Sequence, residues 1–474
     1  MPIDHDSETP LCVDLDGTLI AGDISVESLL HGIKYFPIKS LQALLTFSLS
    51  KIKSELAQVV ILDPSCAKVN EEFFSFLKEE KNKGRKTYLV SASTQKQVQA
   101  YGDYFNVFDE SIGSSSTLNL KGENKAKYLV QRFGQKGFDY AGNGDVDLPV
   151  WRDAKNAIIV GALPTTIQKA SLQGNVVHIF DSLHPNFTTW MKVLRVHQWA
   201  KNLLLFLPLF LSHQLSFASY FDTVKAFISF CLIASGIYIL NDLFDLDADR
   251  QHTLKKKRPI PAGLVTLQSA SLLSASLILT GITLASILPQ RAFFLIALYT
   301  LITFMYSIFL KRIVLIDIFI LASLYVLRIL TGGAAAQVFI SPWMLAFSLF
   351  FFLSLSALKR FSELHNLSLK GKETTKGRGY EVKDQDQISI FGASSGYLSV
   401  VIFTLYITSP EVRILYSTPE CLWFIIPVLL YWMSRVWLFA HRGKMHEDPV
   451  LFALRDGVSY VVFSIAFIIV LLSV

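Results

Sequence analysis

Long apolar runs recur through the second part of the chain, and they constrain the fold more than any other feature. From about Asn202 onward there are nine runs of roughly 20 residues, the length that crosses the hydrocarbon core of a bilayer. Their centres lie near residues 209, 231, 277, 300, 324, 349, 399, 429 and 461. Hydrophobic residues make up 51% of the chain, and these runs account for the excess over a soluble protein. The sequence therefore predicts an all-α polytopic membrane domain of nine transmembrane helices.

Basic residues mark alternate loops between the predicted spans. The loop after the second run carries Arg250 and the basic cluster 255–258, and the loop at 359–383 is also basic. The intervening loops offer little beyond Arg291 and Arg413. Because basic loops stay on the cytoplasmic side, we expect an integral protein of the cell (inner) membrane with its N-terminal domain in the cytoplasm. The net charge of +6 is modest and does not indicate a nucleic-acid partner.

The first 180 or so residues have a different pattern, in which short β-rich runs alternate with helical stretches. The runs "LCVDLD", "KTYLVSAS", "FDYAG", "NAIIVGA" and "VVHIF" are typical of buried strands. Their alternation with helices predicts an α/β Rossmann-like domain with a parallel sheet covered on both faces. Residues 23–64 interrupt the alternation, and we expect a helical cap there, although its apolar face would also suit a membrane surface. We therefore expect one domain at 1–185 and the membrane domain at 190–474.

The stretch "NDLFDLDAD" places several carboxylates at a predicted membrane edge. On a helix that continues the second span, Asp242, Asp245 and Asp249 fall at i, i+3 and i+7 and share one face, whereas Asp247 lies on the opposite side. Such a set of hard oxygen ligands suits Mg²⁺ with open positions for phosphate oxygens. The alternative is a solvated acidic helix end that only answers the basic cluster 255–258.

These residues carry a family resemblance. "NDLFDLDAD" resembles the NDxxDxxxD motif of the UbiA superfamily of intramembrane prenyltransferases, which implies nine helices and a pyrophosphate substrate bound through Mg²⁺. The stretches "LRVHQWAKNLLLF", "YSIFLKR", "LRILTGGAAA" and "LKRFSEL" are similar to the branch that transfers phosphoribose to decaprenyl phosphate. That branch usually has Pro after the histidine of "DADRQHTLKKKRP", where this chain has Thr253.

Basic residues on the predicted cytoplasmic side distinguish the possible substrates. A site that binds phosphoribosyl diphosphate and a polyprenyl phosphate needs more cations than a site that binds a neutral aromatic acceptor. The alternative for any single Lys or Arg here is that it reflects only the charge bias of the loops. The candidates for substrate binding are Asn241, Lys201, Lys255, Lys257, Arg258, Tyr306, Lys311, Lys359 and Arg360. Asp317 and Arg328 lie within a span, where charge is costly, so we expect them to pair or to line the cavity.

The stretch "LCVDLDGTLI" is the second strong signal, because a buried strand followed by DxDGT resembles the first motif of the haloacid dehalogenase superfamily of phosphohydrolases. The resemblance implies that Asp14 attacks phosphorus, that Asp16 is the general acid/base and that both bind Mg²⁺. It also implies phosphate-binding roles for Ser91 and for Lys125, with Lys127 as the alternative lysine.

The final metal motif of that superfamily is altered in this chain. "GNGDVD" resembles GDxxxD, with Asp147 as the acid and Asn143 where the first Asp usually stands. An asparagine can still ligate Mg²⁺ through its carbonyl, but with one charge less. The domain is therefore expected to be a phosphatase, with a docking or regulatory module as the alternative.

The sequence as a whole predicts a Mg²⁺-dependent membrane transferase fused to a phosphatase-like domain. The expected reaction moves 5-phosphoribose from phosphoribosyl diphosphate to polyprenyl phosphate, after which the N-terminal domain removes the 5-phosphate. The alternatives are prenylation of an aromatic acceptor and a non-catalytic lipid-binding scaffold. The sequence does not indicate an oligomeric state.

Overall fold

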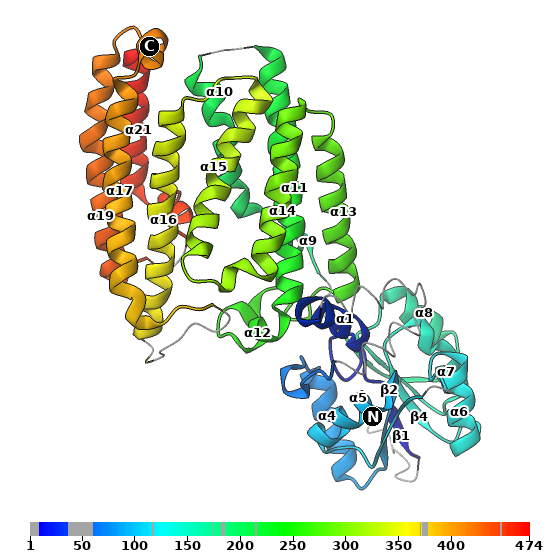
Figure 1. Cartoon of the computed structure of the whole chain (residues 1–474). Coiled ribbons are helices and arrows are strands. Elements are labelled where there is room, and N and C mark those ends of the chain that lie inside the picture. The colour runs from blue at the N-terminus through cyan, green and yellow to red at the C-terminus, as the bar shows by residue number, and fades with distance from the viewer. Residues whose placement is uncertain are drawn as a thin grey trace. The chain divides into compact units, whose positions relative to one another are not determined.

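The computed structural model describes residues 9–36, 60–115, 118–173, 175–181, 185–213, 216–369, 371, 378–445 and 448–474. The chain forms two compact units (Figure 1). Unit 1 consists of Met1–Val193 and Ile239–Leu273, and unit 2 of Leu194–Tyr238 and Ser274–Val474. Helix α11 (Phe217–Phe244) therefore contributes residues to both units.

A six-stranded parallel sheet forms the centre of unit 1, in the order β3-β2-β1-β4-β5-β6. The strands are β1 (Leu11–Val13), β2 (Thr87–Thr94), β3 (Glu110–Ser114), β4 (Asp139–Gly142), β5 (Ala157–Val160) and β6 (Val176–Phe180). Val13 pairs with Leu89 on one side and with Ala141 on the other, so β1 lies in the middle of the sheet. The predicted parallel sheet is confirmed. Strand β3 was not predicted, because "ESIGS" contains no apolar run.

Helices cover both faces of this sheet. They are α1 (Ile24–Tyr35), α4 (Glu71–Asn82), α5 (Gln95–Phe105), α6 (Glu123–Phe133), α7 (Leu148–Asp153) and α8 (Pro164–Ser171), with 3-10 turns η1 (Pro64–Cys66) and η2 (Asp145–Asp147). Leu11 and Val13 pack in one core with Phe73 of α4, whereas Cys12 packs in a second core with Trp151 of α7. Successive β1 side chains therefore point to opposite, buried faces, as a doubly covered sheet requires.

Part of the predicted helical cap is visible in α1. The Asp23 side chain accepts a hydrogen bond from the N–H of Val26 (3.0 Å) and caps the first turn of this helix. Residues 37–59, which complete the predicted cap, lie outside the residues that the structure describes. The remaining elements of unit 1 are most of α9 (Phe187–Leu194), the end of α11, α12 (Leu246–Gln251), η4 (Lys255–Lys257) and the start of α13 (Leu267–Ala285).

Unit 2 is helical. Besides α11 and α13 it contains η3 (Val196–Phe206), α10 (Leu207–Leu211), α14 (Gln290–Ile308), η5 (Leu310–Arg312), α15 (Ile316–Ala336), α16 (Pro342–Ser368), η6 (Val382–Asp384), α17 (Gln385–Ile407), α18 (Pro410–Leu415), η7 (Pro419–Phe424), α19 (Ile425–His441), α20 (Pro449–Ala453) and α21 (Gly457–Ser473). In the described part of the chain, seven helices are long and apolar enough to cross a membrane. The expected count of nine is not reproduced, because η3 and α10 divide the run near 209 and α21 has only 17 residues.

The helices of unit 2 pack as consecutive neighbours. Helix α15 contacts α14 and α16, and α16 contacts α17, which in turn lies beside α19 (Figure 1). A Cβ atom at Gly332 would lie 2.0 Å from the carbonyl oxygen of Leu205, so α15 and η3 approach each other as closely as glycine allows. Asp317 and Arg360 are fully buried and form an ion pair that joins α15 to α16. The costly carboxylate at Asp317 is thus paired within the unit.

Candidate active sites

The loop after β1 presents Asp14 and Asp16 at the carboxyl edge of the sheet. The Asp14 N–H donates to the carbonyl of Ala141 in β4 (3.0 Å), which fixes the start of the loop. The Asp16 carboxylate accepts the N–H of Ile24 (2.7 Å) and the hydroxyl of Ser93 (2.8 Å). Both carboxylates therefore lie where the strand ends of a doubly wound sheet gather ligands.

The end of β2 supplies two serines to this edge. The Ser91 hydroxyl is fully buried and lies 3.5 Å from an Asp16 carboxylate oxygen, and it accepts the N–H of Ser93 (3.1 Å). Ser93 was not among the predicted residues. The signal for it was its spacing, because residues two apart on a strand face the same side.

A buried relay links the predicted lysine to the predicted acid. Lys125 Nζ contacts Asp14 Oδ1 (2.9 Å) and donates to the Tyr140 hydroxyl (2.8 Å), which in turn donates to Asp147 Oδ1 (3.0 Å). The other Asp147 oxygen accepts the N–H groups of Asn143 and Gly144, at 3.0 and 3.1 Å. Tyr140 was not predicted, since a tyrosine in a buried strand usually serves the core. Lys127 is exposed, so Lys125 is the lysine at the site.

Asn143 lies against the loop that follows Asp14. A Cβ atom at Gly17 would be 2.0 Å from Asn143 Nδ2, so the amide fills the space beside this glycine, whose φ is +74°. The structure therefore brings Asp14, Asp16, Asp147 and Asn143 together at the strand ends, as expected. Their oxygen donors fit Mg²⁺, with one negative charge fewer than an aspartate at position 143 would give.

The surroundings change the acidity of both catalytic candidates. Burial raises the pKa of Asp14 to about 6, although Lys125 opposes the shift. Burial also raises the pKa of Asp16 to about 7, and the neighbouring Asp23 carboxylate raises it further. A carboxyl with a pKa near neutrality can give and take a proton, which is what a general acid/base requires.

The acidic segment, residues 241–249 with the sequence "NDLFDLDAD", does not form one straight helix. Helix α11 ends at Phe244 and α12 begins at Leu246, with Asp245 between them at φ −99° and ψ 16°. Asp245 N–H still donates to the carbonyl of Asn241, and Asp249 N–H to that of Asp245, at 2.9 and 2.8 Å. The backbone therefore continues through a bend, and the expectation of a single straight helical face needs correction.

Two of the three carboxylates converge on one cation. Arg258 Nη1 donates to Asp242 Oδ1 (2.9 Å) and to Asp249 Oδ2 (3.0 Å), and Lys255 Nζ lies 3.3 Å from the other oxygen of Asp249. Asp242 and Asp249 are buried. Lys257 is exposed, and Asn241 is half-buried.

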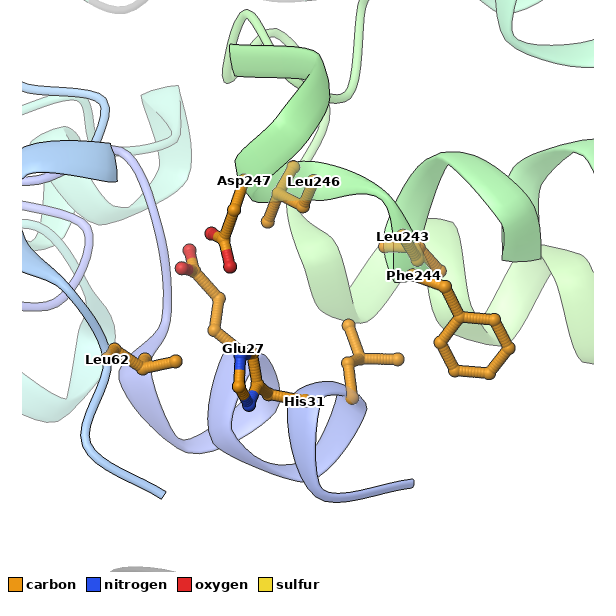
Figure 2. A pocket seen from close by; sticks show the side chains of 8 residues that line it. Glu27, His31, Leu62, Leu243, Phe244, Leu246 and Asp247 are labelled. Atoms are coloured by element: carbon orange, nitrogen blue, oxygen red, sulfur yellow. The ribbon is translucent and has the colours of Figure 1, made fainter. Parts of the chain in front are cut away.

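The third carboxylate points elsewhere. Asp245 Oδ1 accepts from Lys34 Nζ (3.1 Å), which also donates to the carbonyl of Phe244 (2.6 Å). Lys34 belongs to α1, which lies beside the acidic segment within unit 1 (Figure 2). A small pocket between these elements is lined by Glu27, Leu30, His31, Leu62, Leu243, Phe244, Leu246 and Asp247. Asp247, predicted to lie on the opposite side of the helix from the other three carboxylates, faces Glu27 in this pocket.

The predicted substrate-binding residues of unit 2 fall into three groups. Lys201 and Lys359 both contact one oxygen of Asp448, at 2.5 and 3.1 Å. Arg360 forms ion pairs with Asp317 and with Glu363, which indicates a structural role for this residue. Two further candidates, buried Lys311 in η5 and half-buried Tyr306 in α14, lie at the chain's turn between α14 and α15.

Residues 203–458 match the sequence model of the UbiA prenyltransferase family. The chain belongs to this family. It is 35% identical over 462 residues to the protein y4nM of Sinorhizobium fredii, an alignment that covers 96% of this chain and 89% of that protein. It is 28% identical over 282 residues to the decaprenyl-phosphate phosphoribosyltransferase of Mycolicibacterium smegmatis. That alignment covers 58% of this chain and 88% of the relative.

The N-terminal part has its own structural neighbour. A HAD family hydrolase from Salmonella enterica is 16% identical, with a TM-score of 0.28, over 36% of this chain and 68% of the other. The family match confirms the UbiA-family part of the predicted chain. In the N-terminal part, the predicted motif residues lie together at the strand ends. The chain is thus a UbiA-family membrane transferase, and its apolar helices make it an integral membrane protein.

The acidic segment of this UbiA-family chain fits a divalent cation in part. Among the described residues, no three His, Cys, Asp or Glu side chains are grouped closely enough to hold a metal ion as they stand. Asp242 and Asp249 already share one positive charge, and their oxygens are the ligands that Mg²⁺ prefers. These two residues would hold the ion, whereas the Asp245 carboxylate is bound to Lys34.

Proposed function

We propose that the UbiA-family part moves 5-phosphoribose from phosphoribosyl diphosphate to a polyprenyl phosphate, and that the N-terminal domain then removes the 5-phosphate. The observation that carries the first step is the pair Asp242 and Asp249, two buried carboxylates converging on one cation beside Lys255. Mg²⁺ held there would neutralise the charge that develops on departing pyrophosphate. In the reaction, a phosphate oxygen of the lipid bonds to C1 of the ribose while the bond from C1 to pyrophosphate breaks.

The number of cations favours this donor over a prenyl diphosphate. The phosphoribosyl donor carries a 5-phosphate besides its diphosphate, and the lipid acceptor is itself an anion. Lys201 and Lys359 meet at one carboxylate in unit 2, while Lys255 and Arg258 flank the acidic segment in unit 1. The relative from Mycolicibacterium smegmatis, named a decaprenyl-phosphate phosphoribosyltransferase, supports the same choice.

We further propose the arrangement in the membrane. The apolar run divided between η3 and α10, together with α21, would complete nine spans alongside the seven long helices. The catalytic parts would be a phosphatase domain at 1–185 and a transferase domain at 190–474. The basic loops favour the cell (inner) membrane with the N-terminal domain in the cytoplasm.

For the second step, Asp14 would attack the phosphorus of the 5-phosphate and Asp16 would protonate the departing ribose oxygen. Lys125, held between Asp14 and Tyr140, would bind a phosphate oxygen, and Ser91 another. Asp147, Asn143 and the two catalytic candidates would hold Mg²⁺. Hydrolysis of the phosphoenzyme would release inorganic phosphate and regenerate Asp14.

The test uses the purified full chain with Mg²⁺. Phosphoribosyl diphosphate should be consumed, and pyrophosphate released, only when polyprenyl phosphate is present. Turnover of a polyprenyl diphosphate with an aromatic acid would instead support prenyl transfer. Metal-dependent lipid binding without either turnover would support a scaffold.

A further inference from the structure

Asp448 joins two lysines that are far from it in sequence. Its Oδ2 accepts from Lys201 Nζ (2.5 Å), 247 residues away, and from Lys359 Nζ (3.1 Å). Its Oδ1 accepts the N–H of Val450 (3.1 Å) and so caps α20. The Lys201 and Asp448 side chains are each only 9% exposed, whereas Lys359 is 31% exposed. Two ammonium groups are thus held side by side, with one of them reachable from outside.

A third cation lies near the same aromatic ring as Lys201. Arg328 of α15 is buried and donates to three neutral acceptors, Asn202 Oδ1 (2.9 Å), the Leu324 carbonyl (2.6 Å) and the Tyr299 hydroxyl (3.0 Å). Its guanidinium lies 5.4 Å from the Tyr325 ring centroid, and Lys201 Nζ lies 5.9 Å from the same centroid. Within the described ranges Arg328 forms no ion pair.

Counted over the residues that the structure describes, the charges in this cluster do not balance. Lys201, Lys359 and Arg328 carry three positive charges, and Asp448 supplies one negative charge. Two further cations of unit 2, Arg360 and Arg378, pair with the carboxylates of Asp317 and Glu363.

An excess of two positive charges in a largely buried part of a membrane domain is costly unless an anion compensates it. A phosphate monoester carries close to two negative charges near neutral pH, together with three acceptor oxygens. The two lysines each donate one hydrogen to Asp448 and keep others for a ligand.

We propose that Lys201 and Lys359 bind a phosphate monoester and that Asp448 is the positioning residue that holds them together. The site deepens the proposed function and rests on it, because both substrates of that reaction carry such a group: the headgroup of the lipid acceptor and the 5-phosphate of the donor. Asp448 acts through the lysines, since a carboxylate between two ammonium groups removes their mutual repulsion and fixes the spacing of their free N–H donors.

The test measures equilibrium binding to the full chain in nanodiscs, by calorimetry with EDTA present so that no divalent metal contributes. A short-chain polyprenyl phosphate, ribose 5-phosphate and inorganic phosphate are the three probes. Tighter binding of the polyprenyl phosphate identifies the lipid headgroup as the natural ligand, and tighter binding of ribose 5-phosphate identifies the donor's 5-phosphate. Lys201→Ala should weaken that binding about tenfold to hundredfold, because it removes a charged hydrogen bond. Failure of the wild type to bind any of the three overturns the proposal.

Asp448→Asn separates positioning from simple electrostatics. It keeps an oxygen for the cap of α20 but removes the charge between the lysines, so binding should weaken about tenfold if Asp448 positions them. Tighter binding would mean that Asp448 merely lowers the local potential, and would overturn its positioning role. Asp448→Glu should restore part of the affinity.

Lys225→Ala is the matched control, because Lys225 also pairs with an aspartate, Asp222, for which no second lysine partner occurs in the described part of the chain. Its affinity should equal that of the wild type, and an equal loss in Lys225→Ala would overturn the site. Monoester binding without consumption of phosphoribosyl diphosphate would retain the site and reject the proposed function. Normal turnover by Lys201→Ala with unchanged binding would do the reverse.

Discussion

Arg250 donates two hydrogen bonds to the carboxylate of Glu27, at 2.9 and 3.0 Å, although the two residues are 223 positions apart. Each side chain is only 7% exposed. Glu27 belongs to α1, and Arg250 to α12 of the acidic segment. This two-bonded pair ties helix α1 of the N-terminal part to the acidic segment, within the same compact unit.

Breaking this pair should destabilise unit 1. Arg250→Ala leaves a buried carboxylate without its partner, which costs about 3 kcal/mol in comparable cases, and should lower the thermal unfolding midpoint of the purified protein. Glu27→Gln together with Arg250→Ala should recover much of the loss, because no uncompensated charge remains. Additive losses in this double-mutant cycle would show that the two residues do not interact.

The carboxylates of the acidic segment should differ in importance. Asp242→Asn and Asp249→Asn should each lower transfer about hundredfold or more, since each removes half of the shared cation site. Asp245→Asn should have a smaller effect, because that carboxylate is held by Lys34. Asp247→Asn should stay within about twofold of the wild type, as a conservative change outside the pair. Initial rates of pyrophosphate release measure all four, and equal losses would contradict the pairing.

Removing the phosphatase nucleophile should uncouple the two steps. With Asp14→Asn, the phosphorylated lipid should accumulate while its rate of formation stays unchanged. Asp103→Asn, at an exposed position in α5, is the control and should give the same products as the wild type. Chromatography of the labelled lipids distinguishes the two products. If the wild type also stops at the phosphorylated lipid, the domain is not its phosphatase.

The raised pKa values predict how stability depends on pH without metal. In the folded protein the pKa of Asp14 is about 6 and that of Asp16 is about 7. Both are about 3.9 in an unfolded chain, so the native state binds more protons than the unfolded state between about pH 4 and 7. Stability should therefore fall as pH rises through this window. The thermal midpoint in EDTA should be higher at pH 5 than at pH 8, and Asp16→Asn should reduce the difference. An undiminished difference in that variant would exclude Asp16 as its source.

An aspartate at position 143 should strengthen metal binding. Asn143→Asp replaces a neutral oxygen donor by a carboxylate of the same size, so the Mg²⁺ affinity of the phosphatase site should rise about tenfold. Titration of Mg²⁺ while following dephosphorylation, with the Asp14→Asn protein as the blank, measures the change. An unchanged or weaker affinity would mean that the side chain at position 143 does not ligate the metal.

Local patterns in the sequence were enough to predict the sheet and much of its site. Asp14, Asp16 and Ser91 each follow or end a strongly apolar strand, and the carboxyl ends of parallel strands necessarily meet at one edge. Strand β3 was missed because its pairing with β2, and not its composition, makes it a strand. Tyr140 was missed for a related reason, since its hydroxyl acquires a role only between Lys125 and Asp147.

The transferase residues were harder to predict because their partners are distant. The spacing of the acidic residues predicts that Asp242 and Asp249 share a face, and in the structure both bind Arg258. The spacing contains no information on Lys34, which binds the Asp245 carboxylate apart from this pair. Asp448 lies in "HEDPV", a stretch without a recognisable pattern, and becomes notable only beside Lys201 and Lys359. Long-range ion pairs of this kind depend on the packing of helices that sequence periodicity does not orient.

The fit of Asn143 beside Gly17 also has an evolutionary consequence. Asparagine and aspartate have nearly the same shape, so the space next to this glycine accepts either residue without rearrangement of the sheet edge. A single-base change in the codon converts one into the other. A lineage can therefore tune the proposed phosphatase activity through one side-chain atom, while the transferase part and the domain's architecture are inherited unchanged.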